Sequence, residues 1–323
     1  MRFFHLPNVA KALSVVCLGT GSFGSAYTQD ESFALLDAFA ERGGSFVDTA
    51  HVYADWAPGG AGASERTVGR WLHSRGMADR IAIGTKGGHP RLETMSRSRL
   101  RPEEIARDLS ESLERLQLDA VDLYWLHRDD PAVAVGEILT ALNNQLRAGR
   151  IRALGASNWS TGRLTEAADF AARHGLTGFC ASQIAWSLAQ DRTAFDTAQG
   201  TISMDAAVLG YYCASGVKVI PYSAQAGGFF ARPYDALASR DARYHSPLNA
   251  RRWDRVQTLA HARGCSANAM ALAYLLNHPC GGVGIVGPHT LAQVADSCGA
   301  SEIILTAEDL MFLEGETHQG QGA

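Results

Sequence analysis

The sequence predicts an α/β protein that folds as one (β/α)8 TIM barrel. Two observations favour this class. Eight short apolar runs rich in β-branched residues alternate with amphipathic stretches at roughly regular spacing, and no linker or low-complexity segment divides the 323 residues. We therefore predict one barrel domain over residues 1–313, followed by a polar, glycine-rich flexible tail over 314–323.

The predicted strands are the eight apolar runs, each bounded by polar or turn-forming residues. In chain order they are Val15–Leu18, Ser45–Asp48, Ile81–Thr85, Val121–Leu126, Ile151–Gly155, Phe179–Ser182, Val217–Tyr222 and Val283–Val286.

Helices are predicted between these strands, where apolar residues recur with the helical period. They are Glu31–Arg42, Ser64–Arg75, Pro102–Leu116, Val135–Ala148, Thr161–His174, Asp205–Ser215, Ala250–Arg263 and Leu291–Ala300, with an extra pattern at Ala267–Asn277 in the longest interval. Pro102, Glu103 and Glu104 are typical of a first helical turn. Four helices are followed by a glycine where a left-handed residue ends a helix, at Gly43, Gly149, Gly175 and Gly216.

A glycine-rich turn, Gly19-Thr20-Gly21-Ser22-Phe23-Gly24, follows the first strand and raises the alternative of a doubly wound nucleotide-binding sheet. That fold places an acidic residue beside the ribose, at the end of the second strand. Here Asp48 is followed by Thr-Ala-His-Val-Tyr, which is not a ribose loop. The barrel remains the prediction.

Charge and composition argue against several classes of partner. The 29 Lys and Arg residues nearly balance 33 Asp and Glu, so nothing attracts nucleic acid or an anionic membrane. No apolar run approaches the ~18 residues of a membrane helix, and Pro7 and Lys11 interrupt the N-terminal segment. We expect a cytoplasmic protein of undetermined oligomeric state. The scattered cysteines are predicted to be buried free thiols: Cys17, Cys180, Cys213, Cys265, Cys280 and Cys298.

Polar side chains stand at the ends of successive predicted strands, where barrel loops place catalytic groups. Asp48 ends the second strand, Tyr53 follows it, Lys86 ends the third and His127 the fourth. An ammonium beside a phenol stabilises the phenolate, so we expect Lys86 to pull the pKa of Tyr53 down from ~10. Tyr53 could then protonate a carbonyl oxygen that His127 orients. This pattern suits carbonyl reduction, with the hydride supplied by a cofactor.

The motifs are Gly19-Thr20-Gly21, Asp48-Thr-Ala-x-x-Tyr53, Thr85-Lys86, Leu126-His127-x-x-Asp130, Gly155-x-Ser157-Asn158 and Gln183. In this order and spacing they resemble the aldo-keto reductase superfamily, and more closely its longer bacterial and channel-β-subunit-like branches. The resemblance implies an NADP(H)-dependent enzyme that reduces an aldehyde or ketone to the alcohol. It also implies that Asp48, Tyr53, Lys86 and His127 form the catalytic tetrad, with Tyr53 as general acid in reduction and general base in oxidation.

The resemblance further implies a set of cofactor-binding residues: Thr20, Gly21, Asp48, Ser157, Asn158, Gln183, Tyr222, Ser223, Gln225, Gly287, His289, Gln293, Asp296 and Ser297. Ser157, Asn158 and Gln183 would hold the nicotinamide carboxamide, and Tyr222 would stack on its ring. The chain departs from the family at the 2'-phosphate, where relatives carry Lys or Arg and this chain has His289 and Gln293. NAD therefore stays possible beside NADP. A cation from elsewhere could replace the missing one, and the candidates are Arg232 and Arg243.

The predicted substrate is a small carbonyl compound, and a sugar-like one is our interpretation of the residues after the strand ends. These offer flat indole faces and hydrogen-bonding groups: Trp56, Trp159 and Trp186, with His89, Arg128 and Asp129.

Two other functions stay open. A metal-dependent hydrolase could use His51, His89 and His127 beside Asp48 as ligands, although Lys86 would then be idle. A non-enzymatic protein that senses redox state through a bound cofactor is suggested by the channel-β-like relatives. Metal content tests the first alternative, and turnover with a panel of carbonyl compounds tests the second.

Overall fold

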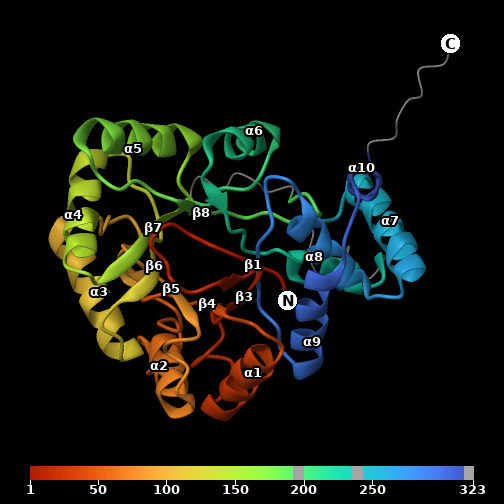
Figure 1. Cartoon of the computed structure of the whole chain (residues 1–323), viewed down its shortest axis with the longest axis horizontal. Coiled ribbons are helices and arrows are strands. Elements are labelled where there is room, and N and C mark those ends of the chain that lie inside the picture. The colour runs from red at the N-terminus through yellow and green to blue at the C-terminus, as the bar shows by residue number, and fades with distance from the viewer. Residues whose placement is uncertain (192–199, 235–242, 316–323) are drawn as a thin grey trace.

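The computed structural model describes residues 1–191, 200–234 and 243–315, and its centre is one curled sheet of eight parallel strands (Figure 1). Across the sheet the order is β10, β3, β4, β5, β6, β7, β8, β9. The strands are β3 (Val16–Gly19), β4 (Phe46–Asp48), β5 (Ala82–Gly87), β6 (Val121–Leu126), β7 (Ile151–Ser157), β8 (Ala181–Gln183), β9 (Lys218–Val219) and β10 (Gly284–Val286). This confirms a single α/β domain with eight parallel strands.

Helices surround the sheet, as Figure 1 shows. They are α1 (Gln29–Glu41), α2 (Ala63–Arg75), α3 (Pro102–Leu116), α4 (Val135–Arg147), α5 (Thr161–His174), α6 (Ala206–Ser215), α7 (Pro247–Arg263), α8 (Ala267–Asn277), α9 (Leu291–Gly299) and α10 (Ala307–Glu314). Short 3-10 helices are η1 (Leu92–Thr94), η2 (Ala226–Ala231) and η4 (Ala300–Glu302). Among the described residues, no helix is long and apolar enough to cross a membrane.

Local sequence explains where these helices begin and end. The side chains of Thr28 and Glu31 form a reciprocal capping box at the start of α1, and α3 begins at a proline followed by two glutamates. All four predicted helix-ending glycines have positive φ: Gly43 (80°), Gly149 (72°), Gly175 (62°) and Gly216 (73°). Those four sequence signals are confirmed.

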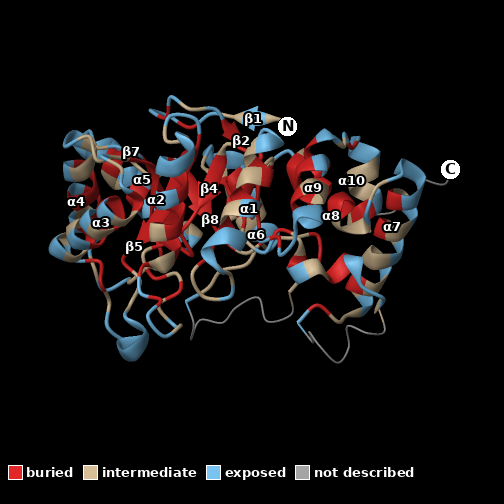
Figure 2. Ribbon diagram, turned by 90° about the horizontal axis from the view of Figure 1, so that it is seen from below, coloured by how far each residue is buried: buried red, intermediate tan, exposed pale blue. Residues whose placement is uncertain are grey.

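Two apolar cores lie on either side of the sheet. One fills the space between sheet and helices. The other lies on the opposite face of the sheet and contains Cys17, Phe46, Trp125 and Ile285, side chains from four strands. Leu6, Val9 and Leu13 join this inner core. They belong to the unpredicted N-terminal hairpin of β1 (Phe3–Phe4) and β2 (Leu13–Ser14), which Figure 2 shows near the N-terminus at the edge of the molecule.

β10 and β9 are the first and last strands of the sheet order, and the chain segments that contain them face each other. β9 is shorter than predicted, although the Ile220 and Tyr222 N–H groups still donate to carbonyls on the β8 side, and Pro221 has no N–H to donate toward β10. We call the facing segments Lys218–Tyr222 and Gly281–Val286 the β9–β10 junction. Within the described residues one backbone hydrogen bond crosses it, from the Ile285 N–H to the Pro221 oxygen at 2.9 Å.

The prediction of six free thiols is wrong for two cysteines. Cys213 of α6 and Cys280, which precedes β10, form a disulfide across 67 residues of sequence. Cys17, Cys180, Cys265 and Cys298 are free, but Cys180 and Cys265 are only partly buried. No local spacing signals a pair that the fold alone brings together.

The C-terminal tail was also predicted to begin too early. Glu314 is the last residue of α10, and its carboxylate accepts a hydrogen bond from the Tyr274 hydroxyl at 2.6 Å. Residues 316–323 lie outside the described part of the chain, so the prediction of a flexible tail stays a prediction there.

Candidate active site

Four ionisable side chains converge at the carboxyl ends of three neighbouring strands. Asp48 is the last residue of β4, Lys86 lies near the end of β5, and His127 follows β6 directly. Tyr53 comes from the loop after β4. Because parallel strands present their carboxyl ends at one edge of the sheet, the sequence order is enough to bring these residues together.

The ammonium of Lys86 organises the group. Its Nζ donates to an Asp48 carboxylate oxygen, to the Thr49 carbonyl at 2.8 Å and to the Tyr53 hydroxyl at 2.9 Å. An ammonium has three protons, so these acceptors use all of them. Lys86 and Asp48 are 0% and 1% exposed, and a buried charge pair without water depends on such complete hydrogen bonding.

Burial and pairing act in opposite directions on the pKa values of Asp48 and Lys86. Burial raises the pKa of Asp48, although Lys86 opposes this by favouring the carboxylate. Burial also disfavours the ammonium, but Asp48 and Tyr53 together more than reverse this, so the pKa of Lys86 is raised. The Gln183 amide donates to the second Asp48 oxygen at 3.1 Å and holds the carboxylate from the other side.

The pKa of Tyr53 differs from the one expected from the sequence. Burial raises its pKa above 10, and the opposing effect of Lys86 is too weak to pull it down toward neutral pH. The phenol is therefore protonated at neutral pH, the form that a proton donor needs. Lys86 still lies over the Tyr53 ring, with Nζ 4.5 Å from the ring centroid.

His127 faces Tyr53 edge to face, with ring centroids 5.9 Å apart. Burial, and then the positive charge of Lys86, hold the pKa of His127 well below its usual value, so its imidazole is neutral. Its buried Nδ1 has no hydrogen-bond partner among the described residues. A polar ligand atom between the neutral imidazole of His127 and the phenol of Tyr53 could therefore hydrogen-bond to both.

A second set of charges fixes the loop that carries Tyr53. The His51 N–H donates to the Lys86 carbonyl at 2.9 Å, and the His51 ring lies 2.7 Å from a Glu111 oxygen. Arg115 donates to Glu111, to the His51 carbonyl and to the fully buried Glu65. These bonds tie the loop to β5 and α3.

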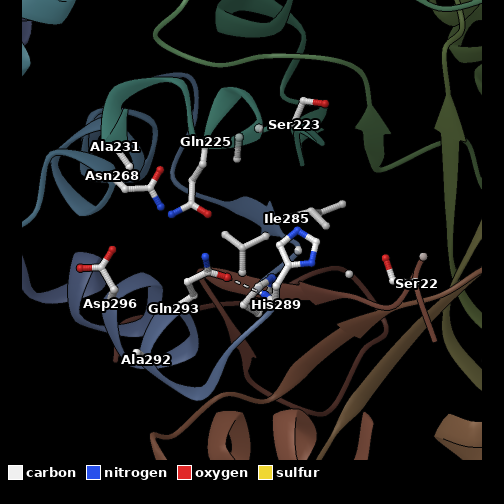
Figure 3. Close-up of a pocket in the computed structure, with 18 of the residues that line it drawn as sticks. Ser22, Ser223, Gln225, Ala231, Asn268, Ile285, His289, Ala292, Gln293 and Asp296 are labelled. Atoms are coloured by element: carbon white, nitrogen blue, oxygen red, sulfur yellow. Dashed lines mark hydrogen bonds between the residues drawn. The ribbon is translucent and has the colours of Figure 1, made fainter. Parts of the chain in front are cut away.

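A cavity of about 750 Å³ opens beside these strands, between the loops that follow β3, β9 and β10. The N-termini of α8 and α9 face it through Ser266, Asn268 and Gln293. Figure 3 shows Gln225 and Asn268 pointing toward each other across it. The buried Asn268 amide oxygen has no partner among the described residues. The two helix N-termini fit a ligand with phosphate groups, such as a dinucleotide, and the unpartnered Asn268 oxygen can accept a hydrogen bond from an N–H or O–H group of the same ligand.

Comparison with known proteins decides the family. The sequence model of the Aldo/keto reductase family matches residues 15–315. The chain belongs to the aldo/keto reductase family. It is therefore an oxidoreductase of that family, and the predicted recognition is confirmed.

Individual relatives are distant but nearly collinear with this chain. Norsolorinic acid reductase stcV of Emericella nidulans is 27% identical over 329 residues, which cover 95% of this chain and 79% of the relative. The uncharacterized oxidoreductase YrpG of Bacillus subtilis is 29% identical, with 97% and 95% covered. An aryl-alcohol dehydrogenase of Pestalotiopsis microspora is 25% identical, with 95% and 80% covered.

Some of the cofactor-binding residues that the family resemblance implies line the cavity. Seven of them line it, namely Gly21, Ser223, Gln225, Gly287, His289, Gln293 and Asp296. Thr20 does not, because its fully buried hydroxyl is bonded to Ser64 and to the Asp48 carbonyl. Ser297 is buried behind the wall, where it contacts Gln225 at 3.2 Å. Neither hydroxyl lines the cavity, and cofactor binding by Thr20 and Ser297 stays a prediction.

The predicted carboxamide-binding residues gather at the ends of β7, β8 and β9. The Asn158 oxygen accepts from the Tyr222 hydroxyl at 3.0 Å and from the Ile202 N–H at 3.1 Å. The Asn158 amide donates to Ser157. Gln183 uses its amide on Asp48, as described above. The predicted contacts with a nicotinamide therefore stay a prediction.

Trp159 was predicted to contact the substrate, but the structure places it in the core. It is 1% exposed, packs on Phe179 in the core, and donates from its indole to the Arg128 carbonyl. The residue before it, Asn158, has a left-handed φ of 58°. His89 does lie at the centre, with its ring 4.8 Å from that of His127.

The site also contains residues that the sequence reasoning missed. Asn268 and Ser266 line the cavity from α8, and Tyr27 lines it from the loop after β3, where its hydroxyl bonds His289. The cap motif at Ser266 gives a helix start but no hint of a ligand. Only the approach of α8 to the loop after β10 makes these residues part of the site.

The proposed histidine ligands of a metal hydrolase are used otherwise. His51 pairs with Glu111, while Asp48 is bound by Lys86. The described residues contain no group of three or more His, Cys, Asp or Glu side chains arranged to hold a metal ion. This arrangement does not support that alternative.

The buried neutral imidazole predicts acid sensitivity. Below pH ~6.5 an unfolded histidine takes up a proton that buried His127 does not, so stability is lost as pH falls toward 5. We expect His127→Gln to have a shallower fall in the free energy of unfolding between pH 7 and 5, by up to ~1.4 kcal/mol per pH unit. Urea unfolding at each pH measures it. His261→Gln, on an exposed part of α7, is the matched control, and equal slopes for all three proteins would contradict the assignment.

Proposed function

We propose that this aldo/keto reductase is an NADP(H)-dependent enzyme that reduces an aldehyde or ketone to the alcohol. The observation that carries the proposal is the position of Lys86, whose Nζ bonds the carboxylate of Asp48 and the hydroxyl of Tyr53 at once. A charged lysine held in this way is a means of polarising a phenol, and the neighbouring cavity fits the cofactor that the reaction requires.

In the proposed mechanism each residue has a separate task. Asp48 keeps Lys86 charged and fixes its direction. Lys86 donates to the Tyr53 oxygen, which makes the O–H proton easier to release to a carbonyl oxygen. Neutral His127 donates a hydrogen bond to that oxygen and stabilises the charge that develops on it. A bound nicotinamide cofactor would supply the hydride. In the oxidation of an alcohol, Tyr53 would accept the proton.

The proposed cofactor is NADP, and Arg232 is the proposed cation for its 2'-phosphate. Arg232 lines the cavity, whereas Arg243 lines a different cavity of about 580 Å³ beside Tyr222. Of these two candidate cations, Arg232 is therefore the one placed beside the proposed cofactor. Arg232 donates only to the Gly227 carbonyl among the hydrogen bonds described for its side chain, at 3.2 Å. Because the residue is at the surface, its guanidinium can turn toward a phosphate.

Titration of the purified protein with NADPH and NADH, followed by quenching of tryptophan fluorescence, tests this proposal. We expect NADPH to bind more tightly, and Arg232→Ala to weaken NADPH by about tenfold with little change for NADH, as for one charge-assisted contact. Arg243→Ala is the matched control and should keep the ratio. An unchanged NADPH affinity in Arg232→Ala would remove this residue from the site. Binding of neither cofactor would overturn the proposed function.

For the substrate we propose an aromatic carbonyl compound in place of the sugar-like one. Trp56 is 56% exposed, and its ring meets Tyr53 edge to face at 6.5 Å, so a large flat surface borders the proton donor. One relative is named an aryl-alcohol dehydrogenase, and another is named a norsolorinic acid reductase. His89 and Arg128 would contact polar substituents.

Three further points belong to the proposal. The curled sheet closes as a (β/α)8 barrel, supported by the Ile285 to Pro221 hydrogen bond between its first and last strands. The proposed compartment is the cytoplasm. A redox-sensing regulatory role remains the second candidate, because slow turnover with tight cofactor binding would fit the same cavity.

A further inference from the structure

The contacts across the β9–β10 junction differ from those between the other neighbouring strands of the sheet. Every other pair of neighbouring strands in the sheet forms a parallel ladder, from β10 with β3 to β8 with β9. The described residues show the single backbone bond from Ile285 across the junction and two side-chain links, the first across the junction and the second just before its two segments. One is Lys218, whose Nζ donates to the Gly281 carbonyl at 2.5 Å. The other is the disulfide between Cys213 and Cys280.

This disulfide is one of two close anchors of helix α6. Tyr212 is the buried residue of that helix, and its hydroxyl lies 2.7 Å from the Ser182 hydroxyl of β8. The next residue, Cys213, is exposed and carries the disulfide. Tyr212 therefore fastens α6 to the β8 side of the junction, and Cys213 fastens it to the segment that leads into β10.

The cofactor cavity straddles the same junction at its other end. Ser223–Gln225, which follow β9, line one side, and Ile285–Gly287, at the end of β10, line the other. The disulfide precedes both strands, and the cavity follows them. The two strands are two and three residues long, which at ~3.3 Å per residue is about 10 Å at most. A change in the distance between β9 and β10 at the disulfide end therefore changes the width of the cavity at the other end.

We propose that Cys213–Cys280 is a thiol–disulfide switch that controls cofactor binding. The inference rests on the proposed function for the identity of the ligand. In the oxidised form the disulfide holds β9 and β10 at the spacing that the cavity needs. Reduction releases α6 from the segment before β10, loosens the junction and weakens binding. By thermodynamic linkage, bound cofactor favours the oxidised form to the same extent.

The reductant is a small thiol or a protein dithiol. Its thiolate attacks the Sγ of exposed Cys213, the S–S bond breaks, and the Cys280 sulfur leaves with the electron pair and takes up a proton. A second thiolate then displaces Cys213, so that two electrons reach the protein and the reductant becomes a disulfide. Exposed disulfides of intracellular proteins are those that such thiols reach.

The test compares four samples by cofactor titration and thermal unfolding: wild type without and with dithiothreitol, Cys213→Ser/Cys280→Ser, and Cys180→Ser as the matched control. Thiol titration in denaturant should count four thiols in the untreated wild type, because the chain has six cysteines and two are joined. We expect reduction to weaken NADPH by ~5-fold or more and to lower the Tm by about 5 °C. The double variant should behave as reduced with or without dithiothreitol, and Cys180→Ser as wild type.

The outcomes separate the two proposals. Six thiols in untreated protein, or equal NADPH affinity of the oxidised and reduced forms, would overturn the switch and leave the proposed function standing. Absence of binding of NADPH and NADH in every sample would overturn the proposed function and the switch with it. If the double variant folds poorly, hydrogen exchange of reduced wild type replaces it. Faster exchange confined to α6 and residues 280–286 supports the switch, and unchanged exchange there contradicts it.

Discussion

Replacing Tyr53 with phenylalanine is expected to lower kcat for carbonyl reduction by about 10²- to 10⁴-fold, the usual contribution of a general acid. The hydroxyl of Tyr53 is the group that Lys86 contacts at 2.9 Å, and phenylalanine removes it while keeping the ring beside His127 and Trp56. Cofactor affinity should not change, because Tyr53 does not line the cavity. Steady-state kinetics and fluorescence titration of the same preparation measure both quantities.

The pH profile provides the control for this variant. Since burial raises the pKa of Tyr53 above 10, wild-type reduction should be flat around neutral pH and fall only in strong alkali, where the phenol ionises. Oxidation of an alcohol, which needs the phenolate, should rise with pH over the same range. Wild-type turnover in Tyr53→Phe, or a reduction rate that falls already near pH 7, would mean that another group supplies the proton.

The placement of the tetrad could be predicted from sequence because it depends on periodicity alone. Once apolar runs identify β4, β5 and β6, the residues at their ends must meet at one edge of a parallel sheet. Asp48, Lys86 and His127 followed directly. The pKa of Tyr53 did not, because the charge of Lys86 can be inferred from spacing whereas the degree of burial, which outweighs it, depends on everything packed around the loop.

Side-chain direction and long-range pairing were the features that sequence could not supply. Thr20 and Trp159 stand at the expected ends of strands, but one hydroxyl turns toward Ser64 and one indole turns into the core. Cys213 and Cys280 are joined only because α6 and the segment before β10 lie together at the end of the sheet. Such contacts depend on closure of the whole fold.

Replacing Lys86 with methionine should have a large effect on both activity and stability. The variant leaves Asp48 buried at 1% exposure without its cation, and removing one partner of a buried ion pair costs about 3–5 kcal/mol. Activity should fall at least as far as in Tyr53→Phe, since Tyr53 loses its polarising contact and the loop loses one of its links to β5. Urea unfolding and steady-state kinetics measure the two effects.

A second variant separates the structural role of the pair from its chemical role. Lys86→Met/Asp48→Asn removes both charges, so most of the lost stability should return, while activity stays at the level of Lys86→Met. The control is Arg75→Met, because Arg75 pairs with Asp37 at 2.9 Å away from the tetrad, and the two side chains are 43% and 32% exposed. This control should lose only about 1 kcal/mol and keep its activity. Recovery of turnover in the double variant would contradict the proposal, because it would show that the ammonium of Lys86 maintains the fold but does not assist proton transfer by Tyr53.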